Sequence, residues 1–294
     1  MDAPDPDLLP GLEEGWADLA TGVRLHWVAK GSGPLVVLLH GFPEHWYGWR
    51  HAIEPLVEAG YRVLAPDLRG YNLSSKPAEV DAYHPEVLGD DVAALLDALG
   101  ASEATVVGHD WGGAAAWFFA MRHPEKLTKL VVMNMPHPVV FAEAWKTLRQ
   151  KLRSAYFYFF RLRSFAAFFY RRFRAFPQRF MLWFFARRKP AWRDLDPYAR
   201  AALREGAMKA MMSYYTALLS RPPDETIALA RKLEGKPVHV IWGTEDPAFA
   251  ERLADPGEHV TPAATVHRVV GAGHFLHLER PDEVNAALLA ALAG

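Results

Sequence analysis

A sharp turn from a strand into a helix within residues 104–117 constrains this chain more than any other stretch. A β-branched run stops there at Gly108, and an Ala-rich helical run starts at Gly112. A strand that reverses directly into a helix forces strained dihedrals on the residue at its tip, so small residues must flank that tip. These two glycines and Gly113 meet this need and put Asp110 at the tip. The turn predicts a carboxylate lifted clear of a sheet, beside helix N-terminal amides that favour an anion. The structural alternative is an ordinary βα turn with an Asp near a helix start.

Short apolar runs that resemble buried strands alternate with helical segments along most of the chain. The strand-like runs are residues 35–40, 61–66, 105–108, 127–133, 238–243 and 265–270. The helical segments are roughly residues 46–58, 85–99, 113–122 and 281–293. This alternation implies right-handed crossovers and an α/β fold, in which a mostly parallel sheet has helices on both faces. Residues 15–31 predict a further two-stranded hairpin around a turn at Thr21 and Gly22.

Polar residues follow directly after the predicted strands. They are His40, Asp67, Asp110, Asn134, Asp246 and His274. Because ligands of α/β sheets bind beyond the carboxyl ends of the strands, we expect a functional site among these residues.

The alternation of strands and helices breaks once, between about residues 137 and 236. This stretch has helical patterns and no convincing strand, which predicts a helical cap (residues 137–236) inserted into a core of residues 1–136 and 237–294. Residues 149–193 carry thirteen Lys or Arg, sixteen aromatic residues and no Asp or Glu. We expect the aromatic rings to pack the cap onto the core and line a pocket while the Arg stems point outward. The alternative is a basic aromatic belt that lies on a membrane or binds a partner.

The composition narrows the class of protein. The chain has 294 residues, 51% of them hydrophobic, which is enough for a large core. It has no cysteine, so disulfides, thiolate zinc sites and a Cys nucleophile are excluded. A formal charge of −1 gives no overall reason to expect nucleic acid as a partner. The acidic, Pro-rich N-terminus has no features of a secretory signal, and no apolar run has the length of a membrane span. We therefore expect a cytoplasmic protein with no integral membrane segment; a homodimer fits the sequence, which leaves the oligomeric state open.

An Asp nucleophile requires a base, a group that orients the base, and donors for the developing oxyanion. His274 follows the last strand in the Gly-flanked loop VVGAGH and is the best placed of thirteen histidines to be the base. Asp246, in WGTED after the preceding strand, is the natural orienting acid for the His274 Nδ1–H. An Asx turn before Pro247 is the structural alternative for this Asp. The chain order of nucleophile, acid and histidine is typical of α/β hydrolytic triads.

The loop after the run of residues 35–40 can supply an oxyanion hole. The backbone amide of Phe42 is expected to point toward the same space as the amide of Trp111, which gives two N–H donors. Pro43 restricts Phe42 to an extended conformation, and the sequence leaves open whether the peptide bond between them is cis. We expect a substrate pocket lined by His40, Pro43, Trp111 and Phe275.

Four motifs together resemble the epoxide hydrolases of the α/β-hydrolase fold. They are GHDWGG at residues 108–113, HGFPEHWYGWR at 40–50, DLRGYNLSSKP at 67–77 and GAGHFLHLERPDEVN at 271–285. The resemblance covers nearly the whole chain after about Gly11. It implies a mostly parallel eight-stranded sheet with an inserted helical cap, an Asp nucleophile, and no metal or cofactor.

The resemblance also implies two cap tyrosines that hold the epoxide oxygen. The first matches Tyr156 in SAYFYFFR, and the second matches Tyr215 in SYYTA. Near the second, this chain has Ser213 and Thr216 where the family has Asn and Arg. Tyrosine suits the task because a phenol stays protonated at neutral pH and can donate to an alkoxide. The neighbouring Tyr158 and Tyr214 are the reserve candidates.

The function implied is hydrolysis of a small apolar epoxide by water to a vicinal diol, through a covalent ester on Asp110. A dehalogenase with the same nucleophile is the nearest alternative, because the indole of Trp111 could bind a halide. However, Phe42 stands where haloalkane dehalogenases commonly have Asn, and fluoroacetate dehalogenases have Arg at the positions of Trp111 and Ala114. An alternative of another class is a non-catalytic, hydrolase-like binding protein. A plain esterase is disfavoured because no Ser occupies the turn.

Overall fold

An eight-stranded sheet forms the centre of the molecule. The computed structural model describes residues 5, 7, 9–174 and 176–293. The strands of the main sheet are β1 (Glu13–Asp18), β2 (Arg24–Lys30), β3 (Leu35–Leu39), β4 (Arg62–Pro66), β5 (Ala104–His109), β6 (Leu127–Met133), β8 (Val238–Gly243) and β10 (Thr265–Val269). Their order across the sheet is β1-β2-β4-β3-β5-β6-β8-β10. β1 pairs antiparallel with β2 and β2 with β4, and the other neighbours are parallel. The predicted mostly parallel, eight-stranded sheet and its N-terminal hairpin are confirmed.

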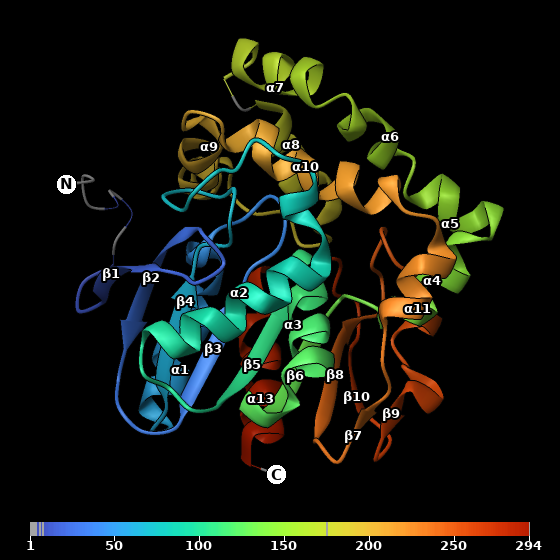
Figure 1. The fold of residues 1–294 in the computed structure, drawn as a ribbon. Coiled ribbons are helices and arrows are strands. Elements are labelled where there is room, and N and C mark those ends of the chain that lie inside the picture. Colours follow the sequence, from blue (N-terminus) through green and yellow to red (C-terminus); the bar gives the residue numbers. More distant parts are fainter. Residues whose placement is uncertain (1–4, 6, 8, 175, 294) are drawn as a thin grey trace.

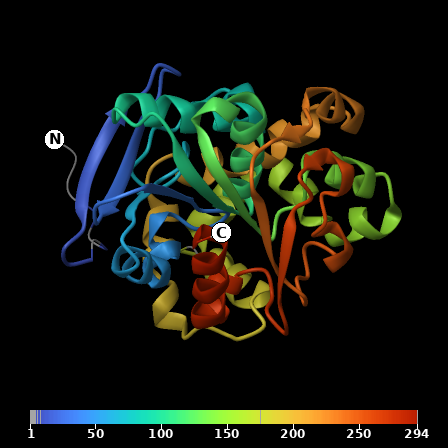
Figure 2. The same cartoon turned by 90° about the horizontal axis from the view of Figure 1, so that it is seen from below.

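Helices cover both faces of the sheet, as the alternating sequence predicts. They are α1 (Arg50–Glu58), α2 (Pro85–Ala98), α3 (Trp111–Arg122), α12 (Leu276–Glu279) and α13 (Pro281–Ala293). α2 and α3 lie on one face of the sheet, and α1 and α13 lie on the other (Figures 1 and 2). Short 3₁₀ helices span Trp46–Trp49, Asp81–Tyr83, Pro124–Lys126, Trp192–Leu195, Glu251–Leu253 and Gly257–His259. Two large clusters of buried apolar side chains fill the two interfaces between sheet and helices.

Between β6 and β8 the chain forms a run of helices. They are α4 (Pro138–Trp145), α5 (Leu148–Arg153), α6 (Tyr156–Arg161), α7 (Arg163–Arg172), α8 (Phe176–Phe185), α9 (Asp196–Leu203), α10 (Ala207–Ser220) and α11 (Pro223–Leu229). Figure 1 shows them above the sheet, at the end of the molecule away from the C-terminus. The expectation of no strand in this stretch is wrong at one place, where β7 (Leu233–Glu234) pairs with β9 (Val260–Thr261). A two-residue strand is too short to leave a periodic pattern in the sequence.

The aromatic residues of 149–193 do not all pack inward as expected. Only six of the sixteen are buried or half-buried, and they are Tyr156, Phe157, Phe160, Phe169, Tyr170 and Phe185. The other ten are exposed to solvent. The expectation fails because these helices form a single layer, and each helix has only one face toward the rest of the protein. Among the described residues, no helix is long and apolar enough to cross a membrane.

A buried ion pair joins the loop after β4 to α2. The Arg69 guanidinium and the Asp91 carboxylate form two hydrogen bonds, and both side chains are 3% exposed. The backbone carbonyl of Arg69 accepts a hydrogen bond of 2.7 Å from the Tyr214 hydroxyl on α10. This ion pair therefore also supports the contact between the inserted helices and the sheet.

The substitution Asp91→Ala should lower the free energy of unfolding by about 3–5 kcal/mol, because it leaves the buried Arg69 charge without a partner. Urea denaturation followed by circular dichroism measures the loss. The neighbouring Asp90→Ala is the matched control, since Asp90 pairs with the partly exposed Arg122 and should cost roughly 0.2–1 kcal/mol. Equal losses in the two variants would contradict the stabilising role of the buried pair.

Candidate active site

Asp110 occupies the tip of the turn between β5 and α3 in a strained conformation. Its φ is +48° and its ψ is −121°, a backbone conformation that residues other than glycine rarely adopt. The turn is tight because a Cβ on Gly112 would lie 2.2 Å from the Leu39 carbonyl oxygen. A Cβ on Gly108 would lie 2.3 Å from the Gly112 carbonyl oxygen. The predicted strand–turn–helix is confirmed, and these contacts are the reason that it requires glycine.

One oxygen of Asp110 is held by the loop after β3. The Phe42 amide donates a 2.8 Å hydrogen bond to Asp110 Oδ1. Gly41 allows this close approach, since a Cβ there would lie 2.4 Å from the Asp110 Cβ. The Phe42–Pro43 peptide bond is cis. The Trp111 amide is the first N–H of α3 and follows Asp110 directly, at the positive end of the helix dipole.

His274 lies between two carboxylates at the carboxyl edge of the sheet. Its Nδ1 donates to Asp246 Oδ2 at 2.8 Å, and its Nε2 lies 3.4 Å from Asp110 Oδ2. Burial acts to lower the pKa of His274, but the charges of Asp246 and Asp110 and the hydrogen bonds to them outweigh it. Together they hold the pKa of His274 well above its usual value. The two carboxylates therefore favour the protonated form of His274, in which the imidazolium faces Asp110.

Asp246 makes the hydrogen bonds of both alternatives drawn from sequence, the Asx turn and the contact with His274. Its Oδ1 accepts hydrogen bonds from the amides of Ala248 (2.7 Å) and Phe249 (3.1 Å), which is the Asx turn. Its Oδ2 accepts the hydrogen bond from His274. The turn thus fixes the carboxylate and leaves one oxygen aimed at the imidazole.

Asn134 and Asp67, two of the polar residues that follow strands, have partners other than the His274 imidazole. Asn134 donates to the carbonyls of Gly273 (2.9 Å) and His274 (3.2 Å), so it supports the histidine loop through its backbone. Asp67 accepts from His26 Nδ1 at 2.7 Å in a separate buried cluster. Neither contacts the imidazole of His274 in the described hydrogen bonds.

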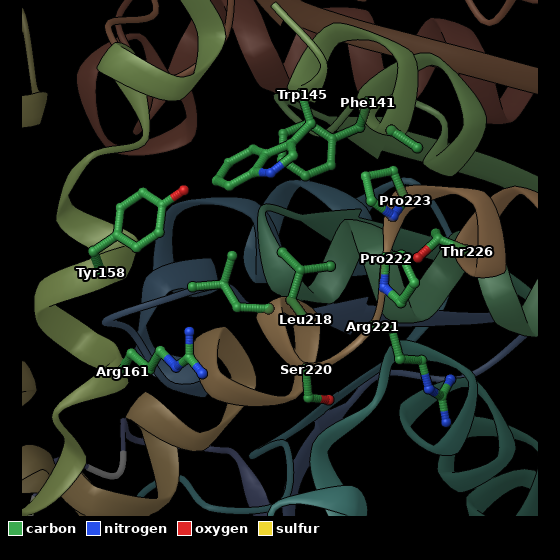
Figure 3. A pocket seen from close by; sticks show the side chains of 12 residues that line it. Phe141, Trp145, Tyr158, Arg161, Leu218, Ser220, Arg221, Pro222, Pro223 and Thr226 are labelled. Atoms are coloured by element: carbon green, nitrogen blue, oxygen red, sulfur yellow. The ribbon is translucent and has the colours of Figure 1, made fainter. Parts of the chain in front are cut away.

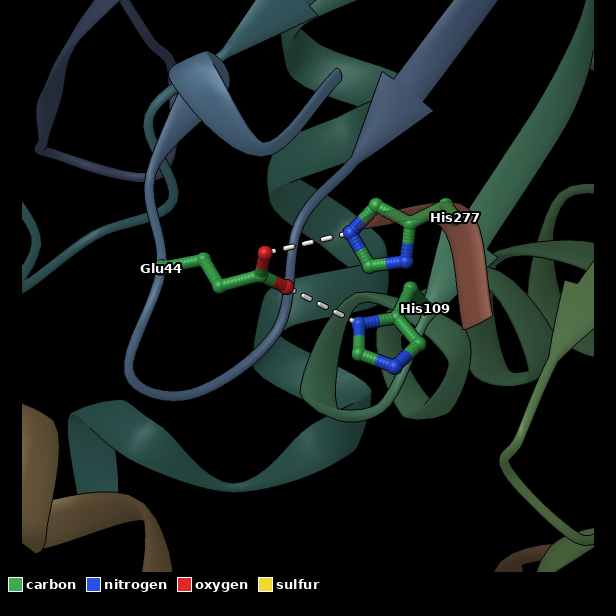
Figure 4. A group of neighbouring side chains, drawn as sticks. All are labelled: Glu44, His109 and His277. Atoms are coloured by element: carbon green, nitrogen blue, oxygen red, sulfur yellow. Dashed lines mark hydrogen bonds and ion pairs between the residues drawn. The ribbon is translucent and has the colours of Figure 1, made fainter. Parts of the chain in front are cut away.

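A buried network behind the site was missed by sequence analysis. His109 Nε2 donates to the His274 carbonyl at 2.8 Å, and its Nδ1 contacts Glu44 Oε2 at 3.0 Å. The other oxygen of Glu44 lies 3.1 Å from His277 Nε2 (Figure 4). Burial acts to raise the pKa of Glu44, but the two histidines outweigh it and hold that pKa below its usual range. Burial lowers the pKa of His277 to about 4, so it faces Glu44 as a neutral donor.

This network contains residue types that also bind metals. Ligand atoms cluster in two groups among the described residues, Glu44–His109–His277 and Asp5–His26–Asp67. In the first group, hydrogen bonds between imidazole and carboxylate already account for the close spacing. In the second group, His26 bonds Asp67, and the Asn72 amide donates to both Asp5 and Asp67. Both Glu44 and His109 lie inside the motifs quoted above, but a sequence gives no sign that they meet.

Tyr156 and Tyr215 come from different helices, α6 and α10, and meet above Asp110. Their ring centroids are 6.0 Å apart. Burial raises the pKa of Tyr156 well above its usual value, and the Asp110 and Asp246 charges add to this. Burial also raises the pKa of Tyr215 well above its usual value, and Tyr156 and Asp110 add to this. Both phenols therefore stay protonated at neutral pH.

The reserve tyrosines point elsewhere. The Tyr214 hydroxyl donates to the Arg69 carbonyl. Tyr158 is 51% exposed and faces a separate, open cavity with Trp145 and Leu218 (Figure 3). That cavity shares no lining residue with the one at Asp110.

A small cavity lies over Asp110, with about 240 Å³ of space between the atoms, part of it open to solvent. Its lining residues are Phe42, Asp110, Tyr156, Met181, Phe185, Tyr215, His274 and Phe275. Of the four pocket residues predicted from sequence, only Phe275 lines it. Met181 and Phe185, from α8, were missed because a segment so rich in apolar residues gives no means of ranking them.

The other three pocket predictions are corrected. Both ring nitrogens of His40 bond backbone atoms, Nδ1 to the Gly41 carbonyl and Nε2 to the Leu68 amide. The Pro43 carbonyl accepts a 2.8 Å hydrogen bond from Gln178 on α8, and Pro43 is not among the residues that line the cavity. The Trp111 ring packs edge-on against Tyr215, with 5.2 Å between centroids, and so contacts a lining residue instead of the cavity.

The chain is similar to known hydrolases over nearly its whole length. Residues 34–281 match the family described as the alpha/beta hydrolase fold. The chain is 39% identical over 276 residues to an AB hydrolase superfamily protein, YfhM, of Bacillus subtilis. The aligned region covers 91% of this chain and 94% of that protein. It is 34% identical over 282 residues to epoxide hydrolase 4 of Mus musculus, which covers 92% of this chain and 77% of that protein.

A solved structure agrees with these relatives. It is a variant of an epoxide hydrolase from Bacillus megaterium, complexed with its product, a naphthyloxy-propane-1,2-diol. It superimposes with a TM-score of 0.78 and 32% identity, and covers 95% of this chain and 100% of that one. The family match, the identities and the shared fold lead to one conclusion: the chain belongs to the epoxide hydrolases of the α/β-hydrolase superfamily.

Proposed function

We propose that this protein hydrolyses small apolar epoxides to vicinal diols through a covalent ester on Asp110. The observation that carries the proposal is the position of Asp110 beneath two protonated tyrosines and beside a charged histidine. The names of the relatives support the substrate class, and the diol bound to the Bacillus megaterium enzyme supports the product class.

In the first step, Asp110 Oδ2 attacks an epoxide carbon. Oδ1 is already held by the Phe42 amide at 2.8 Å, so Oδ2 is the oxygen available for attack. The new bond joins Oδ2 to carbon, and the carbon–oxygen bond of the epoxide breaks. Tyr156 and Tyr215 hold the departing oxygen, which takes a proton from one of them.

In the second step, His274 activates water. Ester formation removes the Asp110 charge, so the pKa of His274 falls and the imidazolium releases its proton. That proton balances the one which the tyrosine gave up in the first step, and the neutral imidazole can then take a proton from water. The water oxygen attacks the ester carbonyl carbon, and the negative charge develops on Oδ1. The amides of Phe42 and Trp111 stabilise that oxyanion, and Asp246 stabilises the imidazolium. The tetrahedral intermediate then collapses: the bond from the carbonyl carbon to the ester oxygen Oδ2 breaks, and the departing oxygen takes the proton of the intermediate's hydroxyl group. The diol leaves and Asp110 is regenerated as a carboxylate.

The inserted helices act in this proposal as a lid. They contribute Tyr156, Met181, Phe185 and Tyr215 to the cavity, while the nucleophile and the histidine come from the parts on either side. We therefore keep the division into a core of residues 1–136 and 237–294 and a lid of residues 137–236. A dehalogenase has no specific support, because Trp111 does not line the cavity and Phe42 offers no side-chain donor for halide.

The covalent step is tested by a single turnover of styrene oxide in heavy-oxygen water, with enzyme in excess. The first diol should carry unlabelled oxygen from Asp110, because water attacks the ester carbonyl and its oxygen stays in the enzyme. Mass spectrometry of diol and protein measures the label. In parallel, His274→Gln should accumulate protein heavier by one epoxide. Solvent label in the first diol would exclude the ester.

Removing either phenol of the lid should slow ester formation. Tyr156→Phe and Tyr215→Phe are each expected to reduce the rate on the order of 10²-fold, the usual loss of a proton donor. Rapid-quench measurement of the ester gives this rate. Tyr158→Phe is the matched control from the same helix and should keep the rate of the parent protein. Equal losses in all three variants would contradict the assigned donors.

The Asp110→Asn variant should lower the pKa of His274. The imidazolium then loses one of its two carboxylate partners and releases its proton at a lower pH. An NMR titration of the His274 ring measures this change. His239 on β8 lies outside the site and should titrate as before. An unchanged or raised His274 pKa would mean that Asp110 does not stabilise the imidazolium.

A further inference from the structure

The outer surface of the lid combines exposed apolar side chains with unpaired cations. We call residues 148–192 the lid surface. Of seventeen large hydrophobic residues that are exposed among the described residues, thirteen lie on it. They are Leu148, Leu152, Tyr158, Phe159, Leu162, Phe165, Phe168, Phe173, Phe176, Phe180, Trp183, Phe184 and Trp192. Concentration of this kind, in contrast to scattered single residues, marks an interaction surface.

The charge of the lid surface has one sign. Residues 149–193 hold thirteen Lys or Arg and no acidic residue, so the rest of the chain sums to −14 from the net charge of −1. Arg179 pairs with Asp196, and Arg187 lies 3.4 Å from Glu245. Eight exposed cations form no ion pair with a described carboxylate. They are Arg149, Lys151, Arg161, Arg171, Arg172, Arg174, Arg188 and Lys189.

The cations flank the apolar side chains within a helical turn. On α7, Ala166 and Tyr170 are buried, whereas Phe165 and Phe168 are 57% and 66% exposed beside Arg172. On α5, Leu148 and Leu152 are exposed around Arg149 and Lys151. α6 and α7 contact α10 on their inner side, and Figure 1 shows α5, α6 and α7 along the outer edge of the molecule. On α7, Phe168, Arg171 and Arg172 line an open hollow together with Glu205 and Lys209.

We propose that the lid surface binds membranes that contain anionic lipids. Aromatic and leucine side chains insert at the boundary between headgroups and acyl chains, and Lys and Arg bind the negative headgroups. A second copy presenting the same face is disfavoured, since two surfaces with cations and no acidic residue repel each other. Nucleic acid would use the charges, but it offers no acyl phase for exposed leucines such as Leu148, Leu152 and Leu162.

Membrane binding would bring the site close to its substrate. An apolar epoxide partitions into the acyl region, and the lid that carries Tyr156 and Tyr215 would rest on that reservoir. This consequence depends on the proposed function, whereas vesicle binding itself does not. A failure of one is therefore distinguishable from a failure of the other.

Co-sedimentation with vesicles tests the charges. The protein should bind phosphatidylcholine vesicles containing phosphatidylserine, bind weakly to pure phosphatidylcholine, and dissociate as salt is raised. Replacing Arg161, Arg171 and Arg172 by Ala should weaken binding on the order of 100-fold, from about a factor of five for each charge. The triple Ala replacement of Lys30, Arg62 and Lys126, on β2, β4 and the 3₁₀ helix before β6, removes the same charge and should bind within about two-fold of the parent.

A fluorescent label tests insertion. Because the chain has no cysteine, Phe168→Cys provides a unique site for an environment-sensitive dye. Its emission should shift to the blue on anionic vesicles, whereas a dye at Asp18→Cys, at the end of β1, should not shift. Absence of vesicle binding, or equal losses in both triple variants, would overturn the proposal. Binding to RNA or heparin without vesicle binding would also overturn it and assign the surface to a soluble polyanion.

Discussion

The burial of three ionisable groups in one place is the constraint on which the rest of this structure depends. Asp110, Asp246 and His274 are 6%, 5% and 4% exposed. Buried charges are tolerated only where partners and hydrogen bonds replace water. Each carboxylate here has one oxygen facing the imidazole and the other held by backbone amides. The loops after β3, β5, β8 and β10 must therefore converge, which the carboxyl edge of a parallel sheet allows.

Convergence of these loops explains the strained backbone at the site. A non-glycine residue at positive φ costs on the order of 1–3 kcal/mol unless its surroundings hold it. Asp110 is held by the close packing of Gly108 on Gly112. Asn134, at φ +43°, follows β6 and bridges the Gly243 amide and the Gly273 carbonyl. Two strained residues on neighbouring strands thus fix the loop that carries the histidine.

The sequence was informative where a function depends on residues close together in the chain. The turn at Asp110, the loop of His274 and the order of the triad follow from local spacing and glycine positions, so the structure brings the predicted groups together. Tyr156 and Tyr215 were available only through a resemblance, because nothing local distinguishes them from Tyr158 and Tyr214. The Glu44–His109 contact joins positions 65 residues apart, and no local pattern encodes it.

Residues 149–193 show a similar limit of what sequence alone can predict. Composition counts sixteen aromatic rings but does not say which side of a single layer each will face. In the structure, the contacts of the basic residues differ between the inner and the outer side of this layer. Where cations approach the site, they bond neutral acceptors: Arg153 donates to the Asp246 carbonyl at 3.3 Å, and Arg163 donates to Ser213 Oγ at 2.8 Å.

On the outer side, cations lie against exposed rings instead. Arg172 lies 5.8 Å from the centre of the Phe173 ring, and Lys189 lies 4.5 Å from that of Trp183. Contacts of this kind add little stability at an exposed site. Exposed apolar rings gathered on one surface disfavour contact with water alone. The cavity at Asp110 accounts for the apolar side chains on the inner face of the inserted helices. Those on the outer face require a separate physical reason, and the proposed anionic membrane supplies one.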